Sequence, residues 1–480
     1  MILRRRFMAD SGMGFAGLAA GAMLATDGVA RGDHVAGQHH FAPRAKSVIW
    51  VFLSGGYSHM ETFDPKPALD RYAGMSYADT PYPNPVDSPL HRKRFRSVPA
   101  EEINVRDVYP KIFPMQVGFR QRGDCGVAIT DWWPHLADCV DDISFVRNMW
   151  TTDNDHAAEN QIHTGRHRLD EPQPSIGAWA HYGLGSMNEN LPRFVVLGGP
   201  TRTDTRASID ANYLGPQHAG VPLQLDPQNP LTFGARQAGH SAAQQTDEFR
   251  FVNELNRLTA QEFPDDEQLQ ARIKSYELAY RMQSAVPEAV DMAAETAQTS
   301  ELYGINEAHS KVAGRRLLAA RRMVERGVRF VQVFPSAYGT WDSHQKLREN
   351  HSKMCGSVDK PIAGLLKDLK QRGLMEDVAV VFCTEFGRTP GLEERSGGAT
   401  GRDHHPNGFT VWLAGAGIKR GHIHGATDEL GYHALGEGHY VTDLHATVLH
   451  LLGLDNTRLE VPGRKRLDID RGNVISDILA

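Results

Sequence analysis

The sequence predicts an α/β protein with a mostly parallel central sheet flanked by helices. Short, apolar, β-branched runs with the length and composition of buried strands alternate along the chain with helical segments. Acidic and imidazole side chains follow several of these runs directly, and strand ends are where an open α/β sheet places its chemistry. A hydrophobic content of 40% and a charged content of 23% are ordinary for a folded globular domain.

Residues 1–30 predict an export signal rather than a part of the fold. Arg4, Arg5 and Arg6 precede a weakly apolar Gly/Ala-rich stretch at 13–25, which is too short to remain as a membrane span. Small residues at 28–30 provide a cleavage site. These features predict twin-arginine export, with the twin-arginine translocase as a partner and the periplasm or the extracellular space as the destination.

The rest of the chain predicts a short linker and one domain. Residues 31–46 are polar and rich in His and Gly, and residues 47–480 are expected to form a single α/β domain. Glu/Gln/Arg-rich helical patterns from about 245 to 326 predict a helical insertion. The net charge of −6 and the lack of a further basic block predict no nucleic-acid partner, and no other segment predicts a stable membrane span.

The four cysteines show no metal-ribbon spacing, because no CxxC pair is present. Cys125 and Cys139 are close enough in sequence to pair in an oxidising compartment. Cys383 lies in an apolar strand, where we expect a small buried thiol.

The first strand, 47–54, leads directly into two glycines and then into His59 and Asp64. Paired glycines allow a ligand to approach the backbone closely. The turn is neither a GxGxxG nor a GKS/T loop, so it does not indicate nucleotide binding. We regard His59 and Asp64 as candidate metal ligands; the alternative for Asp64 is that it caps the turn before Pro65.

The middle of the chain places hydroxyl and imidazole groups before a predicted helix. An Asp/Asn run at 153–155 can cap a helix that begins near Ala157. Thr152 precedes that run, His156 would lie in the first turn, and His163 would lie on roughly the same face. Flanking elements are expected as a helix at 133–141, strands at 143–146, 193–197 and 328–334, and helices at 361–372 and 442–453.

The most informative stretch is 378–415. A buried strand at 378–382 leads to Glu385 and Arg388, and the cluster Asp403, His404 and His405 precedes a second strand at 409–414. A buried carboxylate needs a cation or hydrogen bonds to offset its desolvation. The alternative for Glu385 and Arg388 is a structural ion pair at the end of the sheet.

Polar groups in several loops are expected to meet, since the carboxyl ends of parallel strands share one edge. Carboxylate and imidazole ligands together suit zinc, manganese or iron, whereas carboxylate ligands alone suit magnesium or calcium. We therefore expect one or two divalent ions (zinc, manganese or calcium). The candidate ligands are Asp342, His344, His404, Glu385, Asp64, His59, Asp403 and His405.

Five motifs carry a resemblance to a known family: SGGYSHMETFDPKP, TWDSH, TEFGRTP, GRDHHP and TDLHATVLHLLGLD. Together they resemble a twin-arginine-exported, sulfatase-like family known only as domain of unknown function 1501, within the alkaline-phosphatase superfamily. The resemblance covers nearly the whole mature chain. It implies an alkaline-phosphatase/sulfatase-like fold and a metal-assisted hydrolase ancestry, and it supplies no substrate.

The resemblance also implies roles for individual residues. Asp342, His344 and His404 resemble the three ligands of one metal ion, and Glu385 falls where the superfamily has an Asp ligand of a second. Two features depart from the pattern: Phe386 stands where a metal-binding His is usual, and the loop at 151–156 offers no Cys-x-Pro-Ser-Arg nucleophile motif.

The expected function is hydrolysis of sulfate or phosphate esters on a small molecule or saccharide, with metal-activated attack on a tetrahedral anion. Thr152 is the candidate nucleophile, and Arg388 is the group that holds the anion. His156 is the general acid or base, or a further metal ligand. The alternative is a non-catalytic, metal-stabilised extracytoplasmic binding protein on the same fold, which Phe386 and the missing Ser or Cys nucleophile favour.

Overall fold

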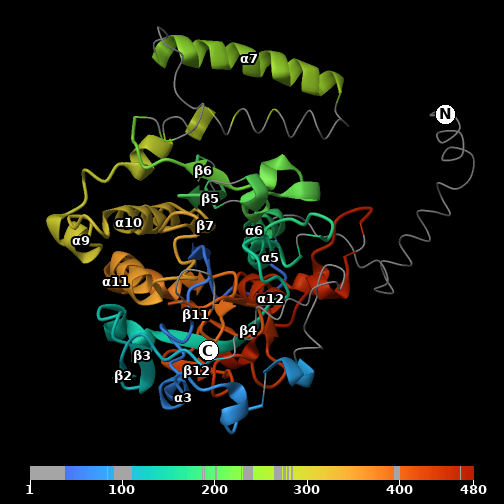
Figure 1. The fold of residues 1–480 in the computed structure, drawn as a ribbon. Coiled ribbons are helices and arrows are strands. Elements are labelled where there is room, and N and C mark those ends of the chain that lie inside the picture. The colour runs from blue at the N-terminus through green and yellow to red at the C-terminus, as the bar shows by residue number, and fades with distance from the viewer. Residues whose placement is uncertain are drawn as a thin grey trace, which may run out of the picture.

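The computed structural model describes most of residues 38–480 (Figure 1). The exceptions within this range are 84, 91–110, 168, 186, 189, 200–202, 229, 231–241, 264–272, 274–276, 278–279, 283–284, 394–399 and 465. The predicted export signal, 1–30, and residues 31–37 of the predicted linker lie outside the described residues. In the described part of the chain, no helix is both long enough and apolar enough to cross a membrane.

A nine-stranded sheet forms the centre of the domain, with the order β12-β4-β11-β8-β1-β7-β5-β6 and β13 beside β4. All of its strand pairs are parallel except the two made by β11, which runs antiparallel to β8 and β4. The predicted mostly parallel α/β sheet is therefore confirmed. The strands are β1 (Ser47–Phe52), β4 (Ile143–Trp150), β5 (Phe194–Leu197), β6 (Val221–Leu223), β7 (Phe330–Val333), β8 (Val378–Cys383), β11 (Phe409–Gly415), β12 (His422–His424) and β13 (His439–Tyr440).

The direction of β11 decides where the His404 loop lies. Trp412 is opposite Phe382, and Phe409 is opposite Met149 near the end of β4. The amino end of β11 therefore lies at the same edge as the carboxyl ends of β4 and β8. The residues just before β11 reach the edge where the loops after β4, β7 and β8 also lie.

Helices cover both faces of the sheet, as predicted (Figure 1). Alternate residues of β1 belong to two separate apolar cores, because successive side chains of a strand point to opposite faces. One core includes apolar side chains of α10 (Lys311–Glu325) and α11 (Leu347–Gln371). The other includes those of α5 (Ala158–Thr164), α6 (Ile176–Leu184) and α12 (Val441–Leu451).

Two helices differ from the sequence prediction. The helix expected at 361–372 begins at Leu347 instead, so Pro361 lies inside it rather than in its first turn. The buried residues Leu347, Cys355 and Val358 pack the part before Pro361 into the core, and this packing outweighs the proline's disruption. The helix expected at 133–141 is a 3-10 helix at Leu136–Asp142, whose first N–H groups are held by the Asp359 carboxylate.

The stretch expected as a helical insertion, about 245–326, contains helices of two kinds. Helix α7 (Ala242–Glu262) carries exposed apolar residues, and Figure 1 shows it apart from the sheet. Helix α10 instead packs directly on the sheet through buried Leu317, Leu318 and Ala320. Helix α9 (Ala297–Leu302), which lies between α7 and α10 in the sequence, contacts α11.

All four cysteines are free. The disulfide considered for Cys125 and Cys139 is therefore absent, and the buried Cys139 thiol lies beside the carbonyl of Ala363 on α11 instead. Cys383 is fully buried on β8, in line with a small apolar role.

Candidate metal centre

Three loops at the carboxyl edge bring imidazole rings around one carboxylate. Asp342 and His344 come from the loop between β7 and α11, and His156 comes from the loop between β4 and α5. His404 lies on β10 (His404–His405), which pairs antiparallel with β9 (Gly387–Arg388) just after β8. The three predicted ligands Asp342, His344 and His404 are thus brought together, and His156 joins them.

The Nε2 atoms of all three rings face Asp342. His156 Nε2 lies 3.1 Å from Asp342 Oδ2, while His344 Nε2 and His404 Nε2 lie 3.1 Å and 3.2 Å from Oδ1. His344 Nε2 and His404 Nε2 are also 3.1 Å apart. The Asp342 side chain is 25% exposed, so the cluster is open to solvent on one side.

Each ring also has an acceptor on its other nitrogen. Nδ1 of His156 lies 3.3 Å from the Glu385 carboxylate, and Nδ1 of His344 lies 2.6 Å from Glu393. Nδ1 of His404 lies 2.7 Å from the carbonyl oxygen of Asn154. An Nδ1–H donated to such an acceptor leaves the Nε2 lone pair free, which is how metal-binding histidines are usually oriented.

This arrangement fits a metal ion. Three Nε2 lone pairs and a carboxylate that converge without a cation would repel one another. Spacings of 3.1–3.2 Å between these atoms match ligands that share one ion at about 2.0–2.1 Å. In each of two groups of three side chains, the possible ligand atoms lie within 4.8 Å of one another. The groups are His156/Asp342/His404 and His344/Asp403/His404, and His404 belongs to both. Imidazole-rich ligands suit zinc or manganese better than calcium.

Hydrogen bonds within the cluster shift the pKa values of its members. Burial opposes a charge on His156, but hydrogen bonds to Asp342 and Glu385 outweigh it and raise the pKa of His156 to about 10. Burial likewise opposes ionisation of Asp342, but hydrogen bonds from the three rings and the charge of Arg388 hold its pKa far below the usual range. Metal binding would replace the proton on His156 as the balancing charge.

Arg388 fixes the position of the Asp342 carboxylate. Its buried guanidinium donates to the carbonyls of Gly56 (2.7 Å), Arg402 (3.0 Å) and Gly55, and to Asp342 Oδ1 at 2.7 Å. The ion pair with Glu385, which was the alternative interpretation of the sequence, is replaced by this one with Asp342. Glu385 accepts instead from the Gly55 N–H and from Thr384. Arg388 therefore orients Asp342, and its guanidinium donors are already occupied.

Phe386 occupies the space where a second metal's imidazole would be expected. Its ring is 4.5 Å from the His404 ring and 5.7 Å from the His156 ring, centroid to centroid. Gly56 lies against it with φ +66°, and a Cβ at Gly56 would come within 2.2 Å of the Phe386 ring. Phe386 is thus an apolar wall of the cluster.

Asp64 and His59 lie outside the cluster. Asp64 is buried with Lys66 at 3.1 Å and Arg147 at 3.7 Å, and it accepts from Thr427. Burial raises its pKa, but these cations outweigh burial and lower it. His59 Nε2 bonds to the carbonyl of Gly431 at 2.8 Å. The lysine and arginine therefore supply the positive charge that Asp64 was expected to take from a metal.

Of the other predicted residues, Asp403 lies next to the cluster, whereas His405, Thr152 and His163 make their contacts elsewhere. Asp403 is adjacent to the cluster, 3.4 Å from His344 Nδ1, and accepts the His404 N–H. His405 is buried and bonds to the carbonyl of Tyr432. The Thr152 hydroxyl accepts from Gln161 at 2.6 Å, and none of its described contacts reaches Asp342. His163 points into the apolar core against Phe52, away from His156.

Two groups of the centre were not anticipated from the sequence. Asn154 acts through its backbone carbonyl, so its side-chain type carries no signal. Glu393 is fully buried and lies in the loop between β9 and β10, outside the five motifs. A carboxylate in a Gly-rich loop after the TEFGRTP motif was the only available sign.

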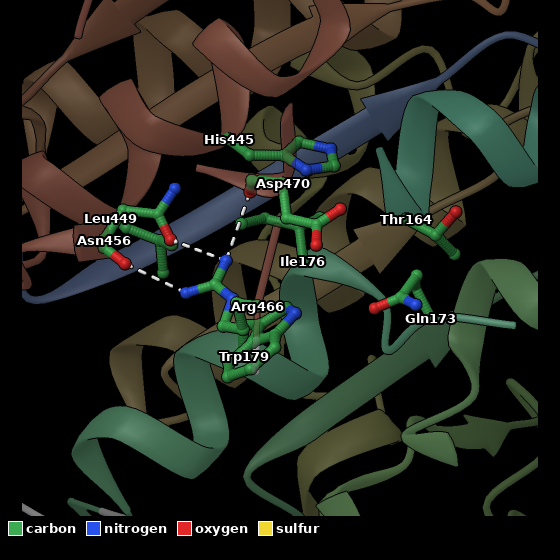
Figure 2. Close-up of a pocket in the computed structure, with 9 residues that line it drawn as sticks. All are labelled: Thr164, Gln173, Ile176, Trp179, His445, Leu449, Asn456, Arg466 and Asp470. Atoms are coloured by element: carbon green, nitrogen blue, oxygen red, sulfur yellow. Dashed lines mark hydrogen bonds between the residues drawn. The ribbon is translucent and has the colours of Figure 1, made fainter. Parts of the chain in front are cut away.

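A separate small cavity lies between α5, α6 and α12, as Figure 2 shows. Arg466 reaches across it, donates to Asn456 and to the carbonyl of Asp470, and lies 4.3 Å above the Trp179 ring. The cavity has a volume of about 10 Å³, which is room for one water molecule, so it is not a substrate site.

A family model described as "Protein of unknown function (DUF1501)" matches residues 45–479. A comparison with curated proteins gave no match. Among solved structures, the chain is similar to a sulfatase from Pseudoalteromonas sp. (13% identity, TM-score 0.33), covering 72% of this chain and 66% of that chain, just under two thirds of its length.

The chain is also similar to a phosphonate monoester hydrolase from Silicibacter pomeroyi (14% identity, TM-score 0.31), covering 72% of this chain and 71% of that chain. A third similar structure is the TAB5 alkaline phosphatase with magnesium bound (11% identity, TM-score 0.29), covering 79% of this chain and 93% of that chain. The similar structures thus include a sulfatase and an alkaline phosphatase, the two kinds of protein named in the sequence resemblance. At these TM-scores the similarity carries no argument about chemistry.

Proposed function

The chain belongs to the DUF1501 family of proteins of unknown function, and on that premise we propose that it is an exported, metal-dependent hydrolase of sulfate or phosphate esters. The observation that carries the proposal is the convergence of three Nε2 atoms on Asp342, each ring oriented by an acceptor on its other side. The residue pattern at 1–30 supports export by the twin-arginine route.

Asp342, His344 and His404 would hold the ion, with Arg388 and Glu393 fixing the first two. When bound, a divalent ion lowers the pKa of water and polarises an ester oxygen. The open side of Asp342 gives substrate access to the cluster.

His156 is the residue best placed to move a proton. Glu385 holds its Nδ1, so Nε2 is the atom that exchanges a proton with the attacking water or the leaving oxygen. His156 contacts the second oxygen of Asp342, apart from the oxygen that His344 and His404 share. This separation supports distinct roles for His156 and for the two other rings.

A direct attack by water fits this chain better than a covalent step. Thr152, the expected nucleophile, has its hydroxyl bonded to Gln161, away from the cluster. Among the described residues, the first turn also supplies no second-metal carboxylate, since Asp64 is paired with Lys66 and Arg147. We therefore propose one ion at this centre and no sulfo- or phospho-enzyme intermediate on Thr152.

The rival is a binding protein that keeps the metal and lacks the reaction. The fully engaged guanidinium of Arg388 favours it, because no fork is left to clamp a tetrahedral anion. Under this alternative the metal would hold an anionic ligand without turnover.

The two functions are separated by one set of measurements. Full-length protein is purified after export, stripped with a chelator, reloaded with zinc or manganese, and assayed with nitrophenyl sulfate, phosphate and phosphonate esters. The hydrolase predicts metal-dependent turnover that His404→Ala abolishes and His309→Ala, an exposed histidine away from the cluster, retains. Tight metal binding with no turnover of any ester would leave the binding role. Absence of metal from folded protein would contradict both.

A further inference from the structure

A pair of histidine rings lies beside β4, on the side of this strand that faces away from β11 and the centre of the sheet. β12 and β13 both pair parallel with β4, one after the other along its length. His424 lies on β12 and His439 on β13, and their Nε2 atoms are 2.8 Å apart. Neither residue belongs to the centre around Asp342.

A carboxylate orients the His439 ring, and a second carboxylate lies near the His424 ring. His439 Nδ1 lies 3.0 Å from Asp443 Oδ2, and Asp443 is itself fixed because its Oδ1 accepts the Asn473 N–H at 2.7 Å. His424 Nδ1 lies 3.5 Å from Asp477 Oδ2. A ring that gives its Nδ1 proton to a carboxylate presents a lone pair on Nε2, as in carboxylate–histidine–metal arrangements.

We propose that His424 and His439 form a second metal site, which takes a dication of tetragonal preference such as Cu²⁺ or Ni²⁺. Two nitrogens 2.8 Å apart, each about 2.0 Å from one ion, subtend roughly a right angle there. A right angle between nitrogen ligands is the arrangement of square-planar and octahedral ions, whereas a tetrahedral ion would need a wider spacing.

The surroundings suit such an ion. The side chains of His424 and His439 are 17% and 21% exposed, which leaves positions for water ligands. The carboxylates of Asp443 and Asp477 contribute negative charge next to the two rings. His422 lies two residues before His424 on the same face of β12, and its buried Nε2 has no hydrogen-bond partner among the described residues.

A bound ion would link β12 and β13 directly, in addition to the pairing that each strand makes with β4. β12 and β13 are short edge strands, and residues 425–438 connect them. β13 pairs with Met149 and Trp150, directly before the loop that carries His156. The site would therefore hold β13 and the start of α12 in place on the last residues of β4. This inference does not depend on the proposed hydrolase activity.

The test counts Cu²⁺ ions on the full-length protein. Wild type, His439→Ala and His424→Ala are dialysed against Cu²⁺, and bound copper is measured with electron paramagnetic resonance of the same samples. We expect each variant to bind one equivalent fewer than wild type and to lose a tetragonal signal with nitrogen coupling. We expect His309→Ala, the exposed-histidine control, to bind as much copper as wild type.

Two further samples keep the inference open to refutation. His439→Gln, checked for folding by circular dichroism, replaces His439→Ala if the smaller side chain perturbs β13. In a His344→Ala/His404→Ala protein, copper should still raise the melting temperature, and His439→Gln should remove that rise. Equal copper stoichiometry in wild type, His424→Ala and His439→Gln would mean that the two rings share only a hydrogen bond, and would overturn the proposal.

Discussion

The role of a single carboxylate can be tested at Glu393. Its buried side chain is 2.6 Å from His344 Nδ1 and fixes that ring toward Asp342. Replacing the carboxylate by an amide in Glu393→Gln should weaken metal binding about 10–100-fold, because the ring loses its charged partner. Competition against a chelator of known affinity measures this change. Glu376→Gln, at an exposed ion pair, is the control and should leave the affinity unchanged.

Arg388 distinguishes a structural role from a substrate role. Its guanidinium makes its contacts with three backbone carbonyls and Asp342, and a lysine cannot reproduce this planar fork. Arg388→Lys should lower the free energy of unfolding by about 3 kcal/mol, the scale of a broken buried pair. Arg420→Lys, at an exposed pair with Glu376, should cost less than about 1 kcal/mol. If Arg388→Lys keeps full stability and metal yet loses turnover, the anion-holding role predicted from the sequence is the correct one.

At the residue scale, spacing and order predicted the core of the centre but not its surroundings. Asp342, His344 and His404 could be predicted because the first two lie in the loop that follows β7 and His404 lies in the segment between β8 and β11. Asp64 also lies after a strand, and nothing local reveals that Lys66 and Arg147 fold onto it. The carbonyl of Asn154 has no side-chain signature. Long-range partners of this kind are decided by packing, which a single sequence does not display.

At the scale of elements, buried strands were predictable from their apolar runs, whereas strand direction was not. The run at β11 has the same composition whether it is parallel or antiparallel, yet its direction brings His404 to the site. The start of α11 was missed for a related reason. A proline usually marks a helix start, and only the buried face before Pro361 shows that this helix begins earlier.

The turn after β1 offers a test of how this element shapes the site. Gly56 has φ +66° and faces Phe386, whereas Gly74 has φ +76° with open space around it. Gly74→Ala should cost only the backbone strain, about 1–2 kcal/mol. Gly56→Ala should cost clearly more, since its Cβ would also collide with the ring. Chemical denaturation of both variants measures the difference, and equal losses would show that Phe386 simply moves aside.

At the scale of the whole molecule, buried histidines make stability depend on pH. Burial lowers the pKa of His163 and His351 to about 3 and that of His445 to about 4. In the unfolded chain these rings titrate near 6.5. A base with a lowered folded pKa contributes its full stability above about 6.5 and loses it as pH falls toward the folded value. Between pH 7.5 and 5 each ring should therefore remove about 2 kcal/mol.

The contribution of one ring can be isolated with His163→Gln. Burial raises the pKa of Asp359 to about 6, which works in the opposite direction, so the total slope is a sum of opposing terms. Comparing wild type with His163→Gln cancels those shared terms. In chelator, which removes any metal effect, the variant should lose about 2 kcal/mol less than wild type between pH 7.5 and 5. Parallel stability curves would show that His163 is solvated or paired in the folded protein, and that the core around Phe52 and Phe334 is looser than its contacts indicate.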